Sequence, residues 1–342
     1  LGSGAFGTGL TTGTDNVAVG DSSGDALTTG TDNTFIGNES GGATTTGANN
    51  VAIGSAALDG NTTASDNIAI GINALGASNT SSNNVAIGTG ALDANTSGSG
   101  VAVGKDALGA NTTGGSNTAV GYAALTANTT ASNNVGIGAS ALASNTTGTE
   151  NIALGAAAGD AITEGNYNIA IGHNALTSDT LGSRSVAVGR HALETQNFTT
   201  ATSVYNIGIG YNAGRLITTG TLNTLVGGLA GDAINTGAAN TAVGYNALGA
   251  NTSANNNTAV GAYSLEGNTT GTSNTAVGAG ALKNNTTAAQ NTAVGIDTLE
   301  ANTTGAANTA FGFEALHANS TAANNVGIGW RALYTNTTGA SN

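Results

Sequence analysis

The 342-residue chain contains no cysteine, no proline and no methionine, and charged residues make up only 7% of it. Without cysteine it can form neither disulfides nor thiolate metal sites. The absence of proline suits a chain whose backbone N–H groups all pair with neighbouring segments, because proline lacks that donor. No methionine is present to start translation, so we expect the chain to be a fragment of a longer array.

Basic and aromatic residues are also scarce. Six Lys and Arg stand against 19 Asp and Glu, which gives a net charge of -13, and aromatic residues are 4% of the chain. So acidic a chain lacks the basic stripe that binds nucleic acid or an anionic membrane, and neither is expected as a partner. No run of about eighteen apolar residues is present, so no part of this segment is expected to span a membrane.

A short motif, Asn-(Thr/Val/Ile)-Ala-(Val/Ile)-Gly, returns along the chain, and we call its last residue the marker glycine. Marker glycines stand at positions 7, 20, 37, 54, 71, 88, 104, 121, 138, 155, 172, 189, 210, 227, 244, 261, 278, 295, 312 and 329. All but three steps are seventeen residues, the exceptions being 13, 16 and 21. A fixed period of this kind indicates stacked repeats that share a core. We expect one continuous array over residues 1–342, with an irregular coil and an insertion at 190–210.

The motif alternates as a β-strand does, with Thr258 and Val260 on one face and Ala259 on the other. The residue before the marker glycine is apolar in every repeat. A leucine often stands four residues after the marker glycine. Where glycine replaces that leucine, as at Gly24, a large residue follows three positions later, as at Leu27. This exchange keeps the interior volume constant. We therefore predict a buried core ladder of Val19, Ile36, Ile53, Ile70, Ile87, Val103, Val120, Ile137, Ile171, Val188, Ile209, Val243, Val260, Val277, Val294, Leu58, Leu92, Leu125, Leu248 and Leu282.

Small residues and asparagines form two further columns. The residue two before the marker glycine is mostly alanine, which would let backbones of neighbouring chains approach closely, so this column is our candidate interface. Its members are Ala52, Ala69, Ala86, Ala119, Ala153, Ala170, Ala187, Ala242, Ala259, Ala276 and Ala293. The opposite arrangement, with alanine inside and the branched residues at the interface, stays open. Stacked amides predict an asparagine ladder of Asn50, Asn67, Asn84, Asn117, Asn134, Asn151, Asn168, Asn240, Asn257 and Asn274.

These patterns predict an all-β chain that forms a parallel β-solenoid of about twenty seventeen-residue coils. The Asn-x-Ala-Val/Ile-Gly strand and its leucine resemble the Asn-Ser-Val-Ala-Ile-Gly repeat of the YadA-like heads of trimeric autotransporter adhesins. They also resemble repeats of phage-tail-fibre-like surface proteins. The resemblance covers essentially the whole chain and implies a left-handed β-roll, three chains side by side, and an adhesive fibre at a cell or virion surface. The partners it implies are two further copies of the chain and an unidentified surface receptor or glycan.

Residues with chemical potential are few, and we expect no catalysis, no cofactor and no metal. Ser22 lies in a Gly-x-Ser-x-Gly pattern but has no histidine near it in the sequence. Candidate ligand contacts gather around the irregular coil: His173, Arg190, His191, Phe198, Tyr205 and Tyr211. An adhesive or structural fibre is the expected function. The alternatives are an ice-binding solenoid, suggested by Asn-x-Thr columns such as Asn61 with Thr63, and a polysaccharide-binding or depolymerising tail-spike segment.

Overall fold

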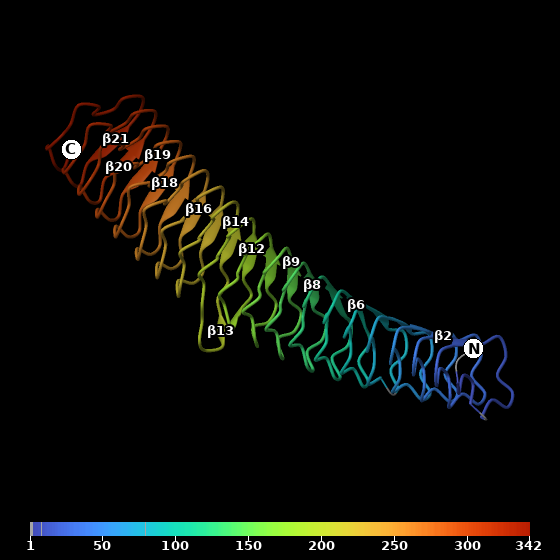
Figure 1. Cartoon of the computed structure of the whole chain (residues 1–342). Helices are drawn as coiled ribbons and strands as arrows, with labels where there is room; N and C mark the ends of the chain where they lie inside the picture. Colours follow the sequence, from blue (N-terminus) through green and yellow to red (C-terminus); the bar gives the residue numbers. More distant parts are fainter. Residues whose placement is uncertain (1–2, 8, 79) are drawn as a thin grey trace. The chain divides into compact units, whose positions relative to one another are not determined.

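The computed structural model describes residues 3–7, 9–78 and 80–342, and these residues form strands and turns with no helix. They group into two compact units, Leu1–Tyr167 and Asn168–Asn342. Within each unit the chain winds into coils that each contribute one short strand to a common sheet (Figure 1). The motif that ends at Gly7 is an exception, since residues 3–6 form turns.

The described residues of unit 1 form nine strands, one for each coil from the second marker glycine onward. They are β1 Val17–Val19, β2 Thr34–Ile36, β3 Val51–Ile53, β4 Ile68–Ile70, β5 Val85–Ile87, β6 Gly100–Val103, β7 Asn117–Val120, β8 Val135–Ile137 and β9 Ile152–Leu154. Each pairs in parallel with the strand of the next coil, so that Ala52 faces Ala69 and Ala69 faces Ala86. The predicted pairing between repeats, rather than within them, is confirmed.

Unit 2 repeats this arrangement with ten strands and adds a short pair beside them. The ten are β10 Ile169–Ile171, β12 Val186–Val188, β14 Ile207–Ile209, β15 Thr224–Val226, β16 Thr241–Val243, β17 Thr258–Val260, β18 Thr275–Val277, β19 Thr292–Val294, β20 Thr309–Phe311 and β21 Val326–Ile328. The additional pair is β11 Gly182–Ser183 with β13 Thr202–Ser203, also parallel. Both units are therefore parallel β-solenoids, as the repeat predicts.

The alanine column faces the interior of each coil, and this decides between the two arrangements left open by the sequence. All eleven predicted interface alanines are 0 to 1% exposed within a single chain: Ala52, Ala69, Ala86, Ala119, Ala153, Ala170, Ala187, Ala242, Ala259, Ala276 and Ala293. Their assignment as an interface between chains is therefore wrong. They are small because the opposite wall of the coil lies close to them.

The branched column lies outside, contrary to the predicted core ladder. Fifteen of its members are half-buried or exposed: Val19, Ile36, Ile53, Ile70, Ile87, Val103, Val120, Ile137, Ile171, Val188, Ile209, Val243, Val260, Val277 and Val294. The physical reason is the two-residue period of a strand. The asparagine that opens the motif is buried and bonded inside the coil, so alanine two residues later is also inside and the branched neighbours must point out.

The leucine half of the core ladder is confirmed. Leu58, Leu92, Leu125, Leu248 and Leu282 are each 0% exposed. Where glycine stands in this column, the substitute residues Leu27, Ile162, Ile217 and Ile234 are buried to the same degree. In these coils the interior is thus filled by one large aliphatic residue, as the compensation in the sequence predicts, whereas the coil of Gly41 has Thr44 at the compensating position.

Marker glycines cannot be replaced by other residues without strain. Gly54 has a φ of 137°, and a Cβ on it would lie 2.5 Å from the carbonyl oxygen of Gly71 in the next coil. Both the backbone conformation and the close approach exclude a side chain. Most marker glycines stand seventeen residues apart because each coil leaves its strand through the same turn.

The predicted asparagine ladder is confirmed, and a second one lies beside it. In the first, the backbone N–H of Asn67 donates to Oδ1 of Asn50 at 3.0 Å, and Asn84 repeats this bond to Asn67. In the second, the asparagine seven residues after a marker glycine is buried: Nδ2 of Asn128 donates to Oδ1 of Asn111 at 2.8 Å. We call this second column the inner ladder. In the sequence these Asn-x-Thr columns suggested only the ice-binding alternative, although their fixed place in the repeat was the available signal for a buried ladder.

Candidate interaction surfaces

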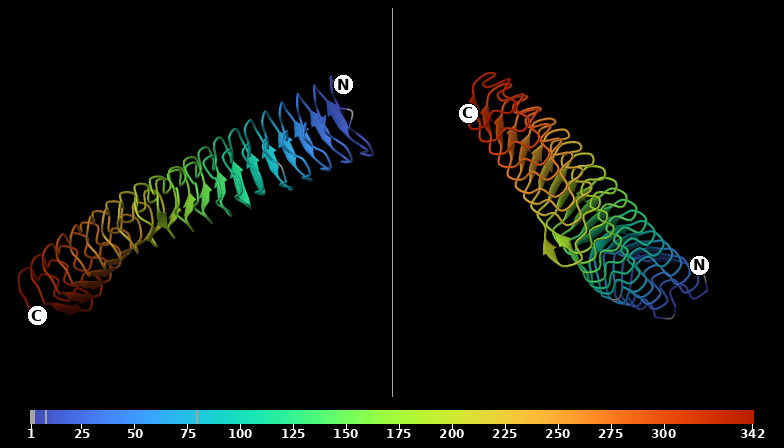
Figure 2. Two further views of the ribbon diagram at one scale, coloured as in Figure 1. Left: turned by 90° about the horizontal axis from the view of Figure 1, so that it is seen from below. Right: turned by 90° about the vertical axis from the view of Figure 1, so that its left-hand side faces the viewer.

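The outward side of the strands presents two neighbouring columns of apolar or β-branched residues, which we call the outer face. They are the first and third residues of each three-residue strand, such as Val17 and Val19, which are 49% and 47% exposed. Figure 2 shows the strands of each unit arranged in one row, so these side chains continue from coil to coil. In β15 to β20 the first column is threonine in every strand. Contiguous apolar surface of this kind typically marks an interaction site.

The borders of the outer face differ between the units. Alternation continues past both strand ends, so the residues two before and two after the strand are also on the outside. In unit 1 the preceding position carries Asp15, Asp32, Asp66 and Glu150, all exposed. In unit 2 it carries Arg184, Tyr205 and Leu222. Unit 1 has twelve acidic residues against one basic residue, whereas unit 2 has seven against five.

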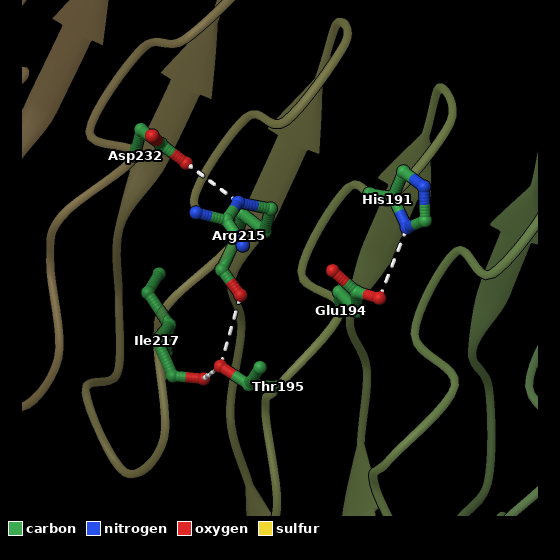
Figure 3. Close-up of polar contacts among 6 residues, drawn as sticks. All are labelled: His191, Glu194, Thr195, Arg215, Ile217 and Asp232. Atoms are coloured by element: carbon green, nitrogen blue, oxygen red, sulfur yellow. Dashed lines mark hydrogen bonds and ion pairs between the residues drawn. The ribbon is translucent and has the colours of Figure 1, made fainter.

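The candidate ligand residues separate into two groups at opposite ends of β12 and β14. His173, Arg190, His191 and Tyr211 follow their strands, and the His173 and His191 rings meet edge to face with centroids 5.6 Å apart. Nδ1 of His191 lies 3.0 Å from a carboxylate oxygen of Glu194 (Figure 3). The hydroxyl of Thr195 lies within 3.0 Å of backbone oxygens of Arg215 and Ile217, which fixes the next coil in place.

The second group belongs to the irregular coil. The ring of Tyr205 is 50% exposed, and the Arg184 guanidinium lies over it at 5.8 Å and donates to the Ser203 hydroxyl at 2.6 Å. Phe198, by contrast, is only 8% exposed, so its assignment as a ligand contact is wrong. The structure therefore does not bring the six predicted residues into one site. The loop that carries β13 extends beyond the neighbouring coils (Figure 1).

A buried acid replaces asparagine where the inner ladder meets the irregular coil. Asp179 occupies the position seven after its marker glycine, and Gln196 occupies the same position one coil later. Asp179 accepts bonds from Nε2 of Gln196 at 2.6 Å, from the N–H of Phe198 at 3.0 Å and from the N–H of Gly182 at 3.1 Å. The longer coil brings the Phe198 N–H as an additional donor, so a second acceptor oxygen is needed. The sequence signal was the departure from asparagine in a fixed column.

Burial raises the pKa of the Asp179 carboxyl above its ordinary value, and the bonds from Gln196, Phe198 and Gly182 lower it in part. A carboxyl whose pKa is higher in the folded state favours folding most when it is protonated. Its contribution to stability is therefore complete below about pH 3.9 and is lost as the pH rises through the folded-state pKa.

Replacing Asp179 with Ala is expected to destabilise the irregular coil by about 3 kcal/mol at neutral pH, because its buried donors lose their acceptor. Amide hydrogen exchange at Gly182 and Phe198 should accelerate, while Thr200→Ala at the exposed end of the same loop should leave these rates unchanged. The wild-type coil should exchange faster as the pH is raised through the folded-state pKa, after correction for intrinsic exchange, and the Asp179→Ala chain should lack this dependence. Unchanged protection in Asp179→Ala would show that the carboxylate does not hold the loop.

A column of ion pairs, which was not predicted from the sequence, connects successive coils of unit 2. Five residues after the marker glycine, Arg215 lies 3.2 Å from Asp232, Lys283 lies 3.8 Å from Glu266 and His317 lies 2.8 Å from Glu300. Figure 3 includes the first of these pairs. Partly exposed pairs contribute little energy, but opposite charges at a seventeen-residue spacing favour the correct register. In unit 1 the same column alternates between aspartate and glycine from Asp25 to Gly109.

The described residues contain no group of three or more His, Asp or Glu side chains that could hold a metal ion, and no pocket. No helix among them is long and apolar enough to cross a membrane. Neither known protein families nor curated proteins match the sequence. The resemblance to YadA-like repeats therefore depends on the residues of the repeat alone.

Proposed function

We propose that this chain is a segment of a structural and adhesive extracellular fibre whose copies associate through the outer face. The observation that supports the proposal most directly is the run of exposed branched residues along the strands of each unit, such as Ile53 and Ile87 at 36% and 37% exposure. Burying such a surface against further copies removes apolar area from water at about 25 cal/mol per Å². A left-handed roll and a side-by-side homotrimer, as the adhesin repeats imply, form part of the proposal.

Several features of the site support a binding scaffold over an enzyme. The acidic, aromatic and basic borders of the outer face vary along the chain, while the interior columns are nearly constant. Constant interior and variable exterior are typical of solenoids whose surfaces bind partners. The exposed Tyr205 beside Arg184 is the candidate contact for a surface glycan, because an aromatic face can stack on a sugar ring while a guanidinium group binds the carboxylate of an acidic sugar.

The oligomeric state in solution tests the proposal. We expect a mass of three times the 32.5 kDa chain by light scattering or sedimentation equilibrium. The double variant Val243→Arg with Val260→Arg places two charges on the outer face and should yield folded monomers. Thr270→Arg with Thr287→Arg carries the same charges on exposed turns of neighbouring coils and should stay trimeric. A monomeric wild-type chain would contradict the association.

Ice binding is the second candidate, and one observation favours it. Exposed hydroxyl residues recur nine residues after successive marker glycines, as at Thr113, Thr130 and Thr147, in coils stacked in parallel register. Strand stacking spaces such groups about 4.8 Å apart, which gives a regular array. The asparagines of the predicted Asn-x-Thr columns, including Asn61, are buried and take no part. Depression of the freezing point below the melting point by a monomeric chain would favour this candidate and exclude the trimer.

A further inference from the structure

The inner ladder coincides with the acceptor pattern for N-linked glycosylation. The sequence carries sixteen Asn-x-Ser/Thr triplets, and in ten of them the asparagine lies in the inner ladder and is 0 to 1% exposed. These ten are Asn61, Asn95, Asn111, Asn128, Asn145, Asn251, Asn268, Asn285, Asn302 and Asn319. Four others are exposed: Asn38, Asn197, Asn256 and Asn284. Asn336 is half-buried, and Asn79 is outside the described residues.

In seven of these ten asparagines the ladder uses both hydrogens of the amide nitrogen that glycosylation would modify: Asn61, Asn111, Asn128, Asn145, Asn285, Asn302 and Asn319. Nδ2 of Asn111 donates to Oδ1 of Asn95 at 3.1 Å and to the carbonyl oxygen of Gly114 at 3.0 Å. Nδ2 of Asn128 donates likewise to Asn111 and to the carbonyl of Ala131, at 2.8 and 3.0 Å. These seven coils therefore have no unused N–H at this atom, and in the other three the amide nitrogen of Asn95, Asn251 or Asn268 donates to the carbonyl oxygen three residues on.

N-linked glycosylation replaces one of these hydrogens. The amide nitrogen bonds to the anomeric carbon of a sugar donated by a polyprenyl-pyrophosphate-linked oligosaccharide, the pyrophosphate leaves, and the amide loses a proton. Where both hydrogens are bonded, one buried acceptor then loses its donor, which is costly inside a protein. The sugar itself would have to occupy an interior that is already packed.

We infer that N-linked glycosylation and folding exclude one another at the ten inner-ladder asparagines. A chain modified at any of them before folding cannot close that coil, whereas a folded chain accepts sugar only at the exposed triplets. The prime acceptor is Asn197, which lies on the extended loop before β13. The chain is consequently suited to a compartment in which folding precedes glycosylation or glycosylation is absent. The ladder geometry alone supports this inference, independently of the proposed fibre function.

The third residue of each buried triplet allows a clean test, because it is exposed in all ten cases. Replacing Thr63, Ser97, Thr113, Thr130, Thr147, Ser253, Thr270, Thr287, Thr304 and Thr321 with Ala removes the triplets and leaves every ladder amide in place. The wild-type chain and this ten-site variant would be produced through a glycosylating secretory pathway. Both would also be produced in bacterial cytosol, where we expect equal yields of protease-resistant chain.

From the secretory pathway, the protease-resistant yield of the wild type should be at least about tenfold below that of the variant, equivalent to about 1.4 kcal/mol. Peptide mass mapping should find sugar on the ten asparagines only in the protease-sensitive fraction, and on Asn197 in the resistant fraction. Thr199→Ala should remove the latter sugar without changing the yield. Sugar on any inner-ladder asparagine of the resistant fraction would overturn the inference, as would equal yields or an unmodified Asn197.

Discussion

Replacing Ala259 with Arg is expected to unfold the coils around β17, with a loss of at least about 4 kcal/mol. Ala259 is 0% exposed and lies between Ala242 and Ala276 of the adjacent strands. An arginine there would place a charge in an interior lined by alanine and leucine, without an acidic partner, and burying an unpaired charge is among the most costly changes a core can undergo. Because each coil contacts only its neighbours, the damage should spread from this layer.

The matched control is Val260→Arg, one residue further along the same strand. Val260 points outward and is half-buried within one chain, so its replacement should change the free energy of unfolding of the monomeric chain by no more than about 1 kcal/mol. Limited proteolysis and amide exchange would locate the effect, with cleavage between β16 and β18 expected only in Ala259→Arg. A folded Ala259→Arg chain beside an unfolded Val260→Arg chain would mean that the inner and outer faces have been assigned the wrong way round.

The sequence predicted the solenoid well because its period is explicit, but it did not decide which strand face is inside. Alanine and valine are both apolar, so their alternation along the strand is equally compatible with either face being buried. The deciding information was the two-residue spacing between the asparagine and the alanine, which puts Asn257 and Ala259 on the same side of the strand. The side-chain amide of Asn257 is buried and must be hydrogen-bonded, so this side faces the interior. Recognising that the asparagine ladder lies inside would have placed alanine there too.

The irregular coil was predictable in place but not in structure. Its length excess was visible between the markers Gly189 and Gly210. The positions of Asp179 and Gln196 in one column were visible in the sequence. The additional bond from the Phe198 N–H was not, because it depends on how the inserted residues fold back against β11. The separation of the six candidate ligand residues into two groups has the same cause, since closeness in sequence does not reveal that a strand lies between them.

The second large loss of stability is expected at Phe35, whose ring fills interior space that a leucine fills in other coils. This side chain occupies the alanine column, is 0% exposed and lies between two coils that have glycine in the leucine column, at Gly24 and Gly41. In the coil of Gly41 the residue three positions on is Thr44, so that coil has no large aliphatic residue of its own. Phe35→Ala should therefore cost about 3 to 5 kcal/mol through lost burial and a cavity.

Replacing Gly41 with Leu should destabilise the wild-type chain but restore stability to the Phe35→Ala chain. A Cβ on Gly41 would lie 2.6 to 2.8 Å from ring atoms of Phe35, so Gly41→Leu in the wild type should cost about 3 kcal/mol through overpacking. Gly41 and Leu58 have φ values of 58° and 56°, so the backbone already has the conformation that leucine adopts in this column. With Phe35→Ala in the same chain, the coil gains the alanine and leucine of the next coil, Ala52 and Leu58, and leucine fills the space left by the ring.

We expect the double variant to lie within about 2 kcal/mol of the wild type, the residual cost arising from the positive φ of a non-glycine residue. The coupling energy of the cycle should then reach about 3 kcal/mol or more, far beyond the value for independent sites. Amide exchange in β2 and β3 would report the four chains, with Leu92→Ala in a distant coil of unit 1 as an uncoupled partner for Phe35→Ala. If the effects of the two substitutions were simply additive, Phe35 and the missing leucine would not share one space. A constant interior volume would then not explain why glycine, leucine and phenylalanine exchange with one another in this repeat.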